Sequence, residues 1–182
     1  MIYYGARHMA DSFRTVRKNT IALAEEIPAD QYDFRAAPGA RSAGELLAHI
    51  AVATRWNVQL HTEGASFIDF QTFGAAMAKA AADEQLLRGR DEILAALEND
   101  GDRFATFLAS LDDQKLSETV GFPPPVQPAT KSRLEMLLGV KEHEMHHRGQ
   151  LMLVQRMLGI TPHLTREAQE RRARASAARQ TA

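Results

Sequence analysis

The sequence contains no cysteine. Disulfide bonds, thiolate nucleophiles and cysteine-based zinc sites are therefore excluded, and any bound metal ion must be held by nitrogen and oxygen atoms. Excess charge is missing too, since the formal net charge is -1 and the pI is about 6.7. Such a balance argues against a nucleic-acid-binding protein, which is typically strongly basic.

Long apolar runs are also absent, because no stretch of the sequence approaches the ~18 apolar residues of a membrane span. Residues 1–8 lack the apolar core that is typical of a signal peptide. We therefore expect a cytoplasmic protein with neither a membrane nor a nucleic-acid partner. No segment alternates apolar and polar residues around a hairpin turn, so the sequence predicts no β-sheet.

The sequence does contain four stretches with helical periodicity, over residues 9–27, 42–64, 91–111 and 132–158. The second and the fourth each begin with a serine followed three residues later by a glutamate, which is typical of a capping box. Proline- and glycine-bearing loops separate the four stretches. This pattern predicts an all-α protein, a four-helix bundle with a long connection between its second and third helices.

The segments outside these helices are less regular. Residues 65–90 carry three phenylalanines and an alanine-rich piece, 74–82, for which we expect a short helix. Residues 165–182 contain five arginines against two glutamates, which indicates a solvated helix or a disordered tail. We therefore predict one metal-binding bundle domain over residues 1–164 and a polar, basic C-terminal tail over residues 165–182.

Two histidines interrupt the apolar stripe of the last helix, His143 and His147, one turn apart where the pattern asks for leucine or valine. Burying two neutral imidazoles without partners costs ~1–3 kcal/mol for each unsatisfied group. A divalent metal ion would remove that cost, and an i, i+4 histidine pair is a common platform for one. The alternative is a pair of histidines hydrogen-bonded to neighbouring polar side chains.

His49 takes a similar place in the apolar face of the second helix. Alone it would be interpreted as a core histidine with a hydrogen-bond partner, but facing helices of a bundle often supply ligands to one metal. We therefore predict a metal site formed by His49, His143 and His147. Three nitrogen ligands leave coordination positions open, as in catalytic sites, and suit Zn or Ni first, with Cu, Co and Fe also possible ions.

Other polar residues near the histidine pair are expected to lie outside the set of metal ligands. His146 is expected beside the site or on the surface, and Glu142 and Glu144 are expected to be solvated, because they lie off the ligand face of the helix. For Arg148 we expect a surface ion pair. The remaining three histidines have no cluster around them and are expected at the surface: His8, His61 and His163. Two glycines inside predicted helices, Gly101 and Gly149, are expected to mark close helix packing.

Two blocks of this sequence resemble the DinB/YfiT-like metalloprotein superfamily. They are His-Glu-Met-His-His-Arg-Gly-Gln-Leu at 143–151, and Tyr-Asp-Phe-Arg-Ala-Ala-Pro-Gly at 32–39 followed by Glu-Leu-Leu-Ala-His-Ile at 45–50. The resemblance covers residues from about 10 to 160 and implies an up-down-down-up bundle. It also implies a metal ion on His49, His143 and His147, and a homodimer.

The resemblance further implies a small-molecule substrate, since family members include transferases that use low-molecular-weight thiols such as bacillithiol or mycothiol. We therefore expect a metal-dependent thiol S-transferase or a metal-dependent hydrolase. Two alternatives remain open at this point. One is a non-enzymatic metal-binding or stress-response bundle, and the other is a bundle without metal whose histidines are hydrogen-bonded.

Overall fold

A computed structural model of the chain describes residues 4–180. Over that range the helices and strands follow one another in this order: α1 (Ala6–Glu26), the short 3-10 helix η1 (Ala29–Gln31), α2 (Ala43–Thr62), α3 (Phe70–Leu86), α4 (Arg90–Ser110), α5 (Asp113–Ser117), β1 (Thr119–Gly121), β2 (Thr130–Ser132), α6 (Arg133–Met157) and α7 (His163–Gln180). None of the described helices combines the length and the apolar character that crossing a bilayer requires.

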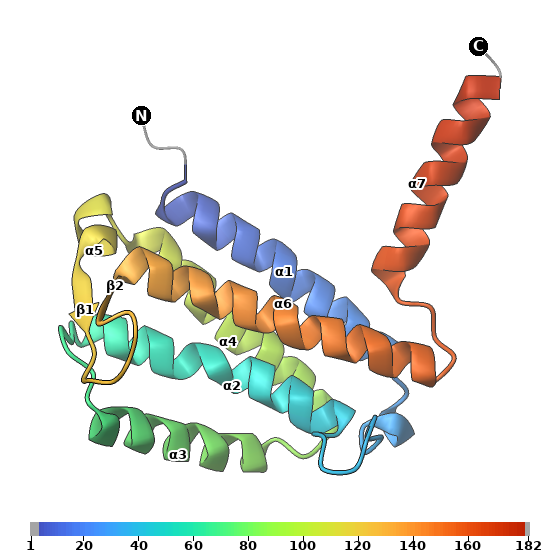
Figure 1. Cartoon of the computed structure of the whole chain (residues 1–182). Helices are drawn as coiled ribbons and strands as arrows, with labels where there is room; N and C mark the ends of the chain where they lie inside the picture. Colours follow the sequence, from blue (N-terminus) through green and yellow to red (C-terminus); the bar gives the residue numbers. More distant parts are fainter. Residues whose placement is uncertain (1–3, 181–182) are drawn as a thin grey trace.

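Four long helices form the bundle, namely α1, α2, α4 and α6 (Figure 1). The chain runs in one direction along α1 and α6 and in the opposite direction along α2 and α4, which is the up-down-down-up order. Helix α4 packs against both α1 and α2, and α6 packs against the same two helices. The predicted all-α bundle with a long connection between its second and third long helices is thus confirmed.

The helix starts follow the sequence signals. At the start of α2, the Ser42 hydroxyl accepts a hydrogen bond of 3.2 Å from the backbone N–H of Glu45, and the Glu45 carboxylate accepts one of 2.8 Å from the N–H of Ser42. These two bonds satisfy backbone donors that have no partner inside the helix. At the start of α6, the hydroxyl of Ser132 accepts from the N–H of Glu135 at 3.1 Å.

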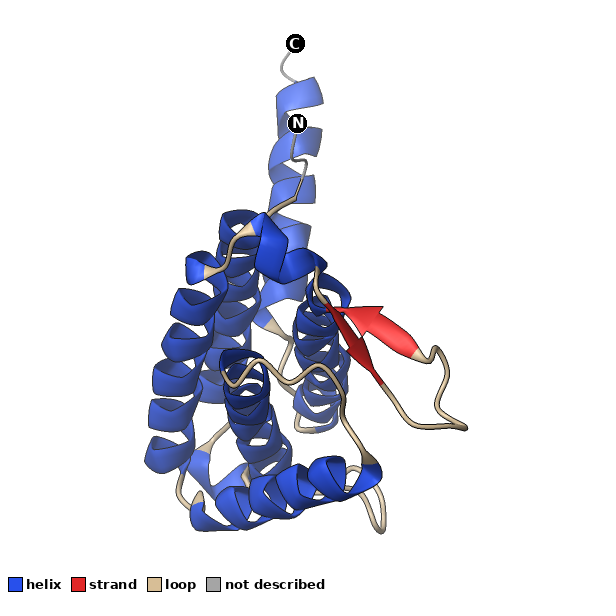
Figure 2. Cartoon of the chain, turned by 90° about the vertical axis from the view of Figure 1, so that its left-hand side faces the viewer, coloured by secondary structure: helices blue, strands red, loops and turns tan. Residues whose placement is uncertain are grey.

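The structure corrects two expectations about the connecting segments and decides between two alternatives for the tail. The alanine-rich piece is part of a helix of 17 residues, α3, rather than a short one over 74–82. The short strands β1 and β2 pair antiparallel, although no sheet was predicted, because three residues are too few to show an alternating pattern. The basic tail forms the helix α7, the first of the two expected forms, and α7 points away from the bundle (Figure 2). The hairpin of β1 and β2 lies on the flank of the bundle.

Two apolar clusters fill the bundle, one toward each end. Buried polar side chains lie between them: Arg17, Thr20, Thr54, Asp100 and Glu144.

The two glycines expected at close helix contacts differ. Gly101 confirms the expected close packing, because a Cβ added to it would lie 2.8 Å from the side chain of Arg17. The other glycine, Gly149, does not, since an added Cβ would meet nothing within 4 Å. Glycine therefore makes room in the bundle for one buried guanidinium group.

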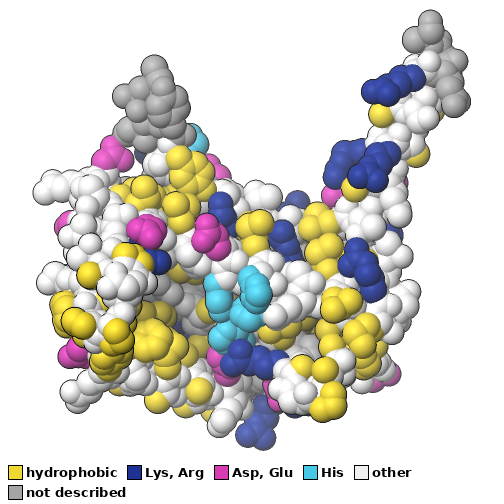
Figure 3. Space-filling view, in the orientation of Figure 1, with side chains coloured by type: hydrophobic (Ala, Val, Ile, Leu, Met, Phe, Trp, Pro, Cys, Tyr) yellow, Lys and Arg dark blue, Asp and Glu magenta, His cyan; other side chains and the backbone are white. Residues whose placement is uncertain are grey.

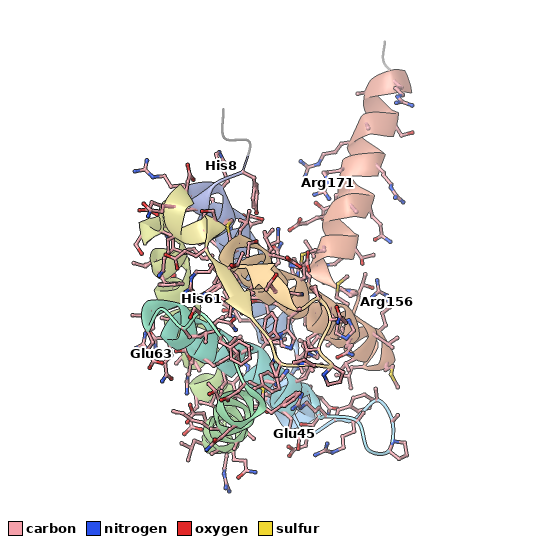
Figure 4. The ribbon with its side chains drawn as sticks, turned by 60° about the vertical axis from the view of Figure 1, so that its left-hand side comes forward. His8, Glu45, His61, Glu63, Arg156 and Arg171 are labelled. Atoms are coloured by element: carbon pink, nitrogen blue, oxygen red, sulfur yellow. The ribbon has the colours of Figure 1, made fainter. Side chains whose placement is uncertain are left out.

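His61 was expected at the surface, and that prediction is wrong, because this residue is only 1% exposed. It lies near the C-terminal end of α2, beside the hairpin (Figure 4). Arg133 donates a hydrogen bond of 3.0 Å to His61 Nδ1, and Arg133 also donates to the carboxylate of Glu118 at 2.8 Å. Burial, together with the positive charges of Arg133 and Lys115, lowers the pKa of His61 to about 4. This histidine is therefore a neutral acceptor that joins α2 to α6.

The lowered pKa of His61 predicts an acid-sensitive fold. Between about pH 6.5 and pH 4 the unfolded chain binds a proton at this residue and the folded chain does not. The contribution of His61 to the free energy of unfolding is therefore fully present above pH 6.5. It decreases as the pH drops toward 4, and at pH 5 it is smaller by about 2 kcal/mol. His61→Gln keeps an acceptor for Arg133 but cannot titrate. Urea unfolding in the presence of a chelator should show that this variant loses about 2 kcal/mol less than the wild type on acidification.

A matched control is His8→Gln, which replaces an exposed histidine of α1. It should lose as much stability on acidification as the wild type. An equal loss in His61→Gln and the wild type would show that this histidine is protonated inside the folded protein and does not link stability to pH.

Candidate metal centre

The structure brings together the three histidines that the sequence predicts as ligands. His49 comes from the middle of α2, and His143 and His147 lie one turn apart in α6. One ring nitrogen from each residue lies within 4.8 Å of the other two. Figure 3 shows a patch of histidine side chains at the centre of one face of the molecule. Helices that are far apart in the sequence therefore place three imidazoles in one group, which could hold a metal ion.

The hydrogen bonds around the cluster determine which ring nitrogen carries the proton. His49 Nδ1 lies 2.7 Å from the carboxylate of Glu84, and His147 Nδ1 lies 2.8 Å from the amide oxygen of Gln150. Both oxygens can only accept, so each Nδ1 must donate, and the neutral ring then has a free lone pair on Nε2. The Gln150 amide nitrogen is 3.2 Å from the ring of His146, which agrees with this orientation of the amide.

The Nε2 atoms of the three histidines lie close together. The Nε2 atom of His143 lies 3.0 Å from the Nε2 atom of His49 and 3.0 Å from that of His147. Lone pairs that face each other at this distance repel unless a cation or a proton lies among them. Two nitrogens bonded to the same ion at about 2.0–2.1 Å are themselves roughly 3 Å apart. The three residues thus fit a divalent metal ion and leave further coordination positions for other ligands.

The electrostatics of the cluster favour neutral imidazoles. Burial, together with the neighbouring His147 and His49, lowers the pKa of His143 to about 4. Burial also lowers the pKa of His147, against the effect of its hydrogen bond to Gln150. The charge of Arg41 acts on both rings in the same direction. At neutral pH these rings are therefore unprotonated, which is the form that binds metal ions.

Glu84 is a residue of this site that the sequence did not indicate. It lies on α3, its carboxylate accepts from His49, and its other oxygen lies 3.4 Å from the guanidinium of Arg41. A carboxylate behind a metal-ligating histidine orients the ring and makes it a stronger ligand. The alanine-rich pattern could predict a helix around this residue but could not predict which helix it packs against.

The residues predicted to surround the pair divide into two groups. His146 and Glu142 are exposed, as expected for outer roles. Glu144 was expected to be solvated, and that prediction is wrong, since Glu144 is 2% exposed and pairs with Arg17. The half-buried Arg148 donates to the backbone carbonyl of Val16, and within residues 4–180 the structure gives it no ion pair.

Of the three isolated histidines, His8 is exposed as expected. His163 is buried instead, like His61, and among residues 4–180 neither of its ring nitrogens has a hydrogen-bond partner. The structure therefore leaves both buried histidines outside the three-histidine cluster.

A cleft of about 420 Å³ leads to the cluster. Helices α2, α3 and α6 form its walls, and His49 and His143 lie on its surface together with Arg41 and Glu84. This volume is within the ~300–1,000 Å³ that is typical of sites for small molecules. The cluster is thus accessible to a small-molecule ligand.

Comparison with known proteins gives consistent results. A family model described as the DinB superfamily matches residues 12–151. Among solved structures, the crystal structure of a DinB-like protein, YjoA, from Bacillus subtilis is similar, with a TM-score of 0.62 and 22% sequence identity. The likeness covers 84% of this chain and 92% of that chain. At this level of identity the similarity supports the fold. No match was found among curated proteins.

Proposed function

Because the chain belongs to the DinB superfamily, we propose that it is a metal-dependent transferase that joins a low-molecular-weight thiol to an electrophilic small molecule. His49, His143 and His147 would hold the ion, with zinc or nickel as the first candidates. The observation that carries this proposal is the convergence of three histidine Nε2 atoms beside a cleft. Glu84 and Gln150 hold two of the rings in the orientation that this arrangement needs.

A bound divalent cation supplies Lewis acidity, which lowers the pKa of a coordinated thiol or water. The chain has no cysteine, so the sulfur must come from a separate molecule. In the overall reaction the thiol proton passes to solvent and the sulfur forms a bond to an electrophilic carbon. The group that is displaced from this carbon leaves with the electron pair of the broken bond. The residues of the chain orient both molecules and keep the imidazoles neutral.

The carboxylates near the cluster support thiol transfer over hydrolysis. Glu84 is engaged by His49 and Arg41, and Glu144 is turned into the core toward Arg17. Glu142 is exposed. A hydrolase usually places a free base within hydrogen-bond reach of the attacking water. A thiol with a lowered pKa is itself a good nucleophile and requires no such base.

The cobalt-substituted protein gives a direct test of this proposal. Adding 2-mercaptoethanol should produce a sulfur-to-cobalt charge-transfer band in the near ultraviolet, because a thiolate bound to cobalt absorbs there and oxygen ligands do not. The same band should appear in His146→Ala, which alters an exposed histidine outside the predicted ligand set. It should be absent in His49→Ala. A cobalt protein whose spectrum does not respond to thiol would reject the transferase, and thiol-independent ester cleavage would indicate a hydrolase instead.

A further inference from the structure

The cleft beside the histidines has a mostly apolar surface. Large apolar side chains come from all three of its walls: Val52 and Trp56 on α2, Phe73 and Met77 on α3, and Met136 on α6. The rings of Trp56 and Phe73 meet edge to face, with centroids 6.1 Å apart and planes at 80°. Phe73 remains 48% exposed even though it lies in this wall. Aromatic and thioether side chains on a concave surface are well suited to contact a flat, apolar molecule.

The end of the cleft near the histidines is polar and contains one cation, Arg41. The side chain of Arg41 is 46% exposed, and its ion pair with Glu84 is long, at 3.4 Å. A guanidinium group has five N–H donors in a planar fork that matches a carboxylate or a sulfonate. Arg41 therefore has donors available for an anionic group that enters the cleft.

We propose that this cleft binds an aromatic or similarly flat apolar molecule that carries one anionic group, with the ring between α2, α3 and α6 and the anion at Arg41. The proposed molecule would be the electrophile of the transferase described above, so this part of the proposal rests on the proposed function. Binding of such a molecule depends on the apolar walls and on Arg41, so it can be measured whether or not the protein carries out a transfer.

Gly139 is a position at which a larger side chain can be introduced to fill the cleft. It lies in α6 on the surface of the cleft, and a Cβ added there would meet nothing within 4 Å. Gly139→Leu therefore fills the cleft without a clash at the backbone, and leucine is also a better helix former than glycine. Gly149→Leu is the matched control, because Gly149 lies in the same helix, is exposed, and has the same open space around its Cα.

Two fluorescent probes with the same ring system test the proposal. One is 8-anilinonaphthalene-1-sulfonate, which is anionic, and the other is N-phenyl-1-naphthylamine, which lacks the sulfonate. Gly139→Leu should weaken the binding of both probes by at least about tenfold, because the ring of the probe loses its apolar contact area. Arg41→Gln should weaken the binding of the sulfonate probe alone, by about tenfold at low salt. Gly149→Leu should leave both affinities unchanged. Circular dichroism confirms that each variant is folded.

Several outcomes would overturn the proposal. If Gly139→Leu bound both probes as tightly as the wild type, the probes would lie on another apolar surface, such as the exposed Phe67 and Phe70. If Arg41→Gln bound the sulfonate normally, the anion would not be held at Arg41. The same titrations with His49→Ala distinguish a failure of this proposal from a failure of the proposed function. Probe binding that survives loss of the metal ion supports the cleft even if no transfer occurs.

Discussion

His143→Ala should abolish stoichiometric metal binding, whereas the purified wild-type protein should hold about one equivalent of zinc or nickel. His143 is the central member of the cluster, since its Nε2 atom lies 3.0 Å from both of the other Nε2 atoms. Loss of a ligand that binds the ion directly should cost more than the ~10–100-fold in affinity that is typical of outer hydrogen-bond partners. Elemental analysis and competition with a chromophoric chelator measure the content and the affinity.

Glu84 should show the smaller effect in the same assay. Glu84→Ala removes the carboxylate that accepts from His49 and should weaken metal binding by roughly 10–100-fold. Asp83→Ala is a matched control, because Asp83 lies on the same helix and pairs with Arg55 and Lys79 instead. It should bind metal normally.

The metal prediction has a clear contrary result. If the wild type held no metal after incubation with zinc or nickel, and if a chelator left its melting temperature unchanged, the histidines would form a hydrogen-bonded polar cluster. The proposed enzymatic function would then be withdrawn. A site that binds should instead raise the free energy of unfolding by about 4 kcal/mol at a free metal concentration 1,000 times the dissociation constant.

The second large effect is expected from the buried ion pair between α1 and α6. Arg17 and Glu144 are joined by bonds of 2.9–3.1 Å, and their side chains are only 5% and 3% exposed. Thr20 donates to the same carboxylate at 2.7 Å. Glu144→Leu leaves the guanidinium buried without its counter-ion and should reduce the free energy of unfolding by about 3–5 kcal/mol. Urea denaturation in the presence of a chelator measures this loss.

Two variants serve as controls for that loss. Arg14→Met removes the exposed pair with Asp11 on the same helix and should change stability by less than about 1 kcal/mol. The double variant Arg17→Met/Glu144→Leu should recover most of the stability that Glu144→Leu loses, because no charge is then left unpaired. A double variant as unstable as Glu144→Leu would show that packing volume, and not charge, determines the loss.

The three-histidine cluster was predictable because it interrupts a regular pattern. His143 and His147 occupy positions of an amphipathic helix where apolar residues are expected, and His49 does the same in another helix. The capping serines, Ser42 and Ser132, also lie where their spacing places them. Signals of this kind are local, and they depend only on the geometry of a single helix.

The features that were missed depend on contacts between helices. Glu144 lies beside the ligand face of α6, and only the packing of α1 against that side buries it. Glu84 and His49 are 35 residues apart, and only the position of α3 brings them together. His61 is buried because Arg133, from the start of α6, covers it. A single sequence carries no pattern that reports such pairings.

Helix α3 differs from the four bundle helices because none of its residues is fully buried. Opening it exposes little apolar surface, so its amide protons should exchange through local unfolding at a free energy well below that of the whole domain. This helix also forms one wall of the cleft and holds Glu84 behind His49. We therefore expect α3 to detach from the bundle more readily than the four long helices, and such an event would widen the cleft while the bundle stays folded.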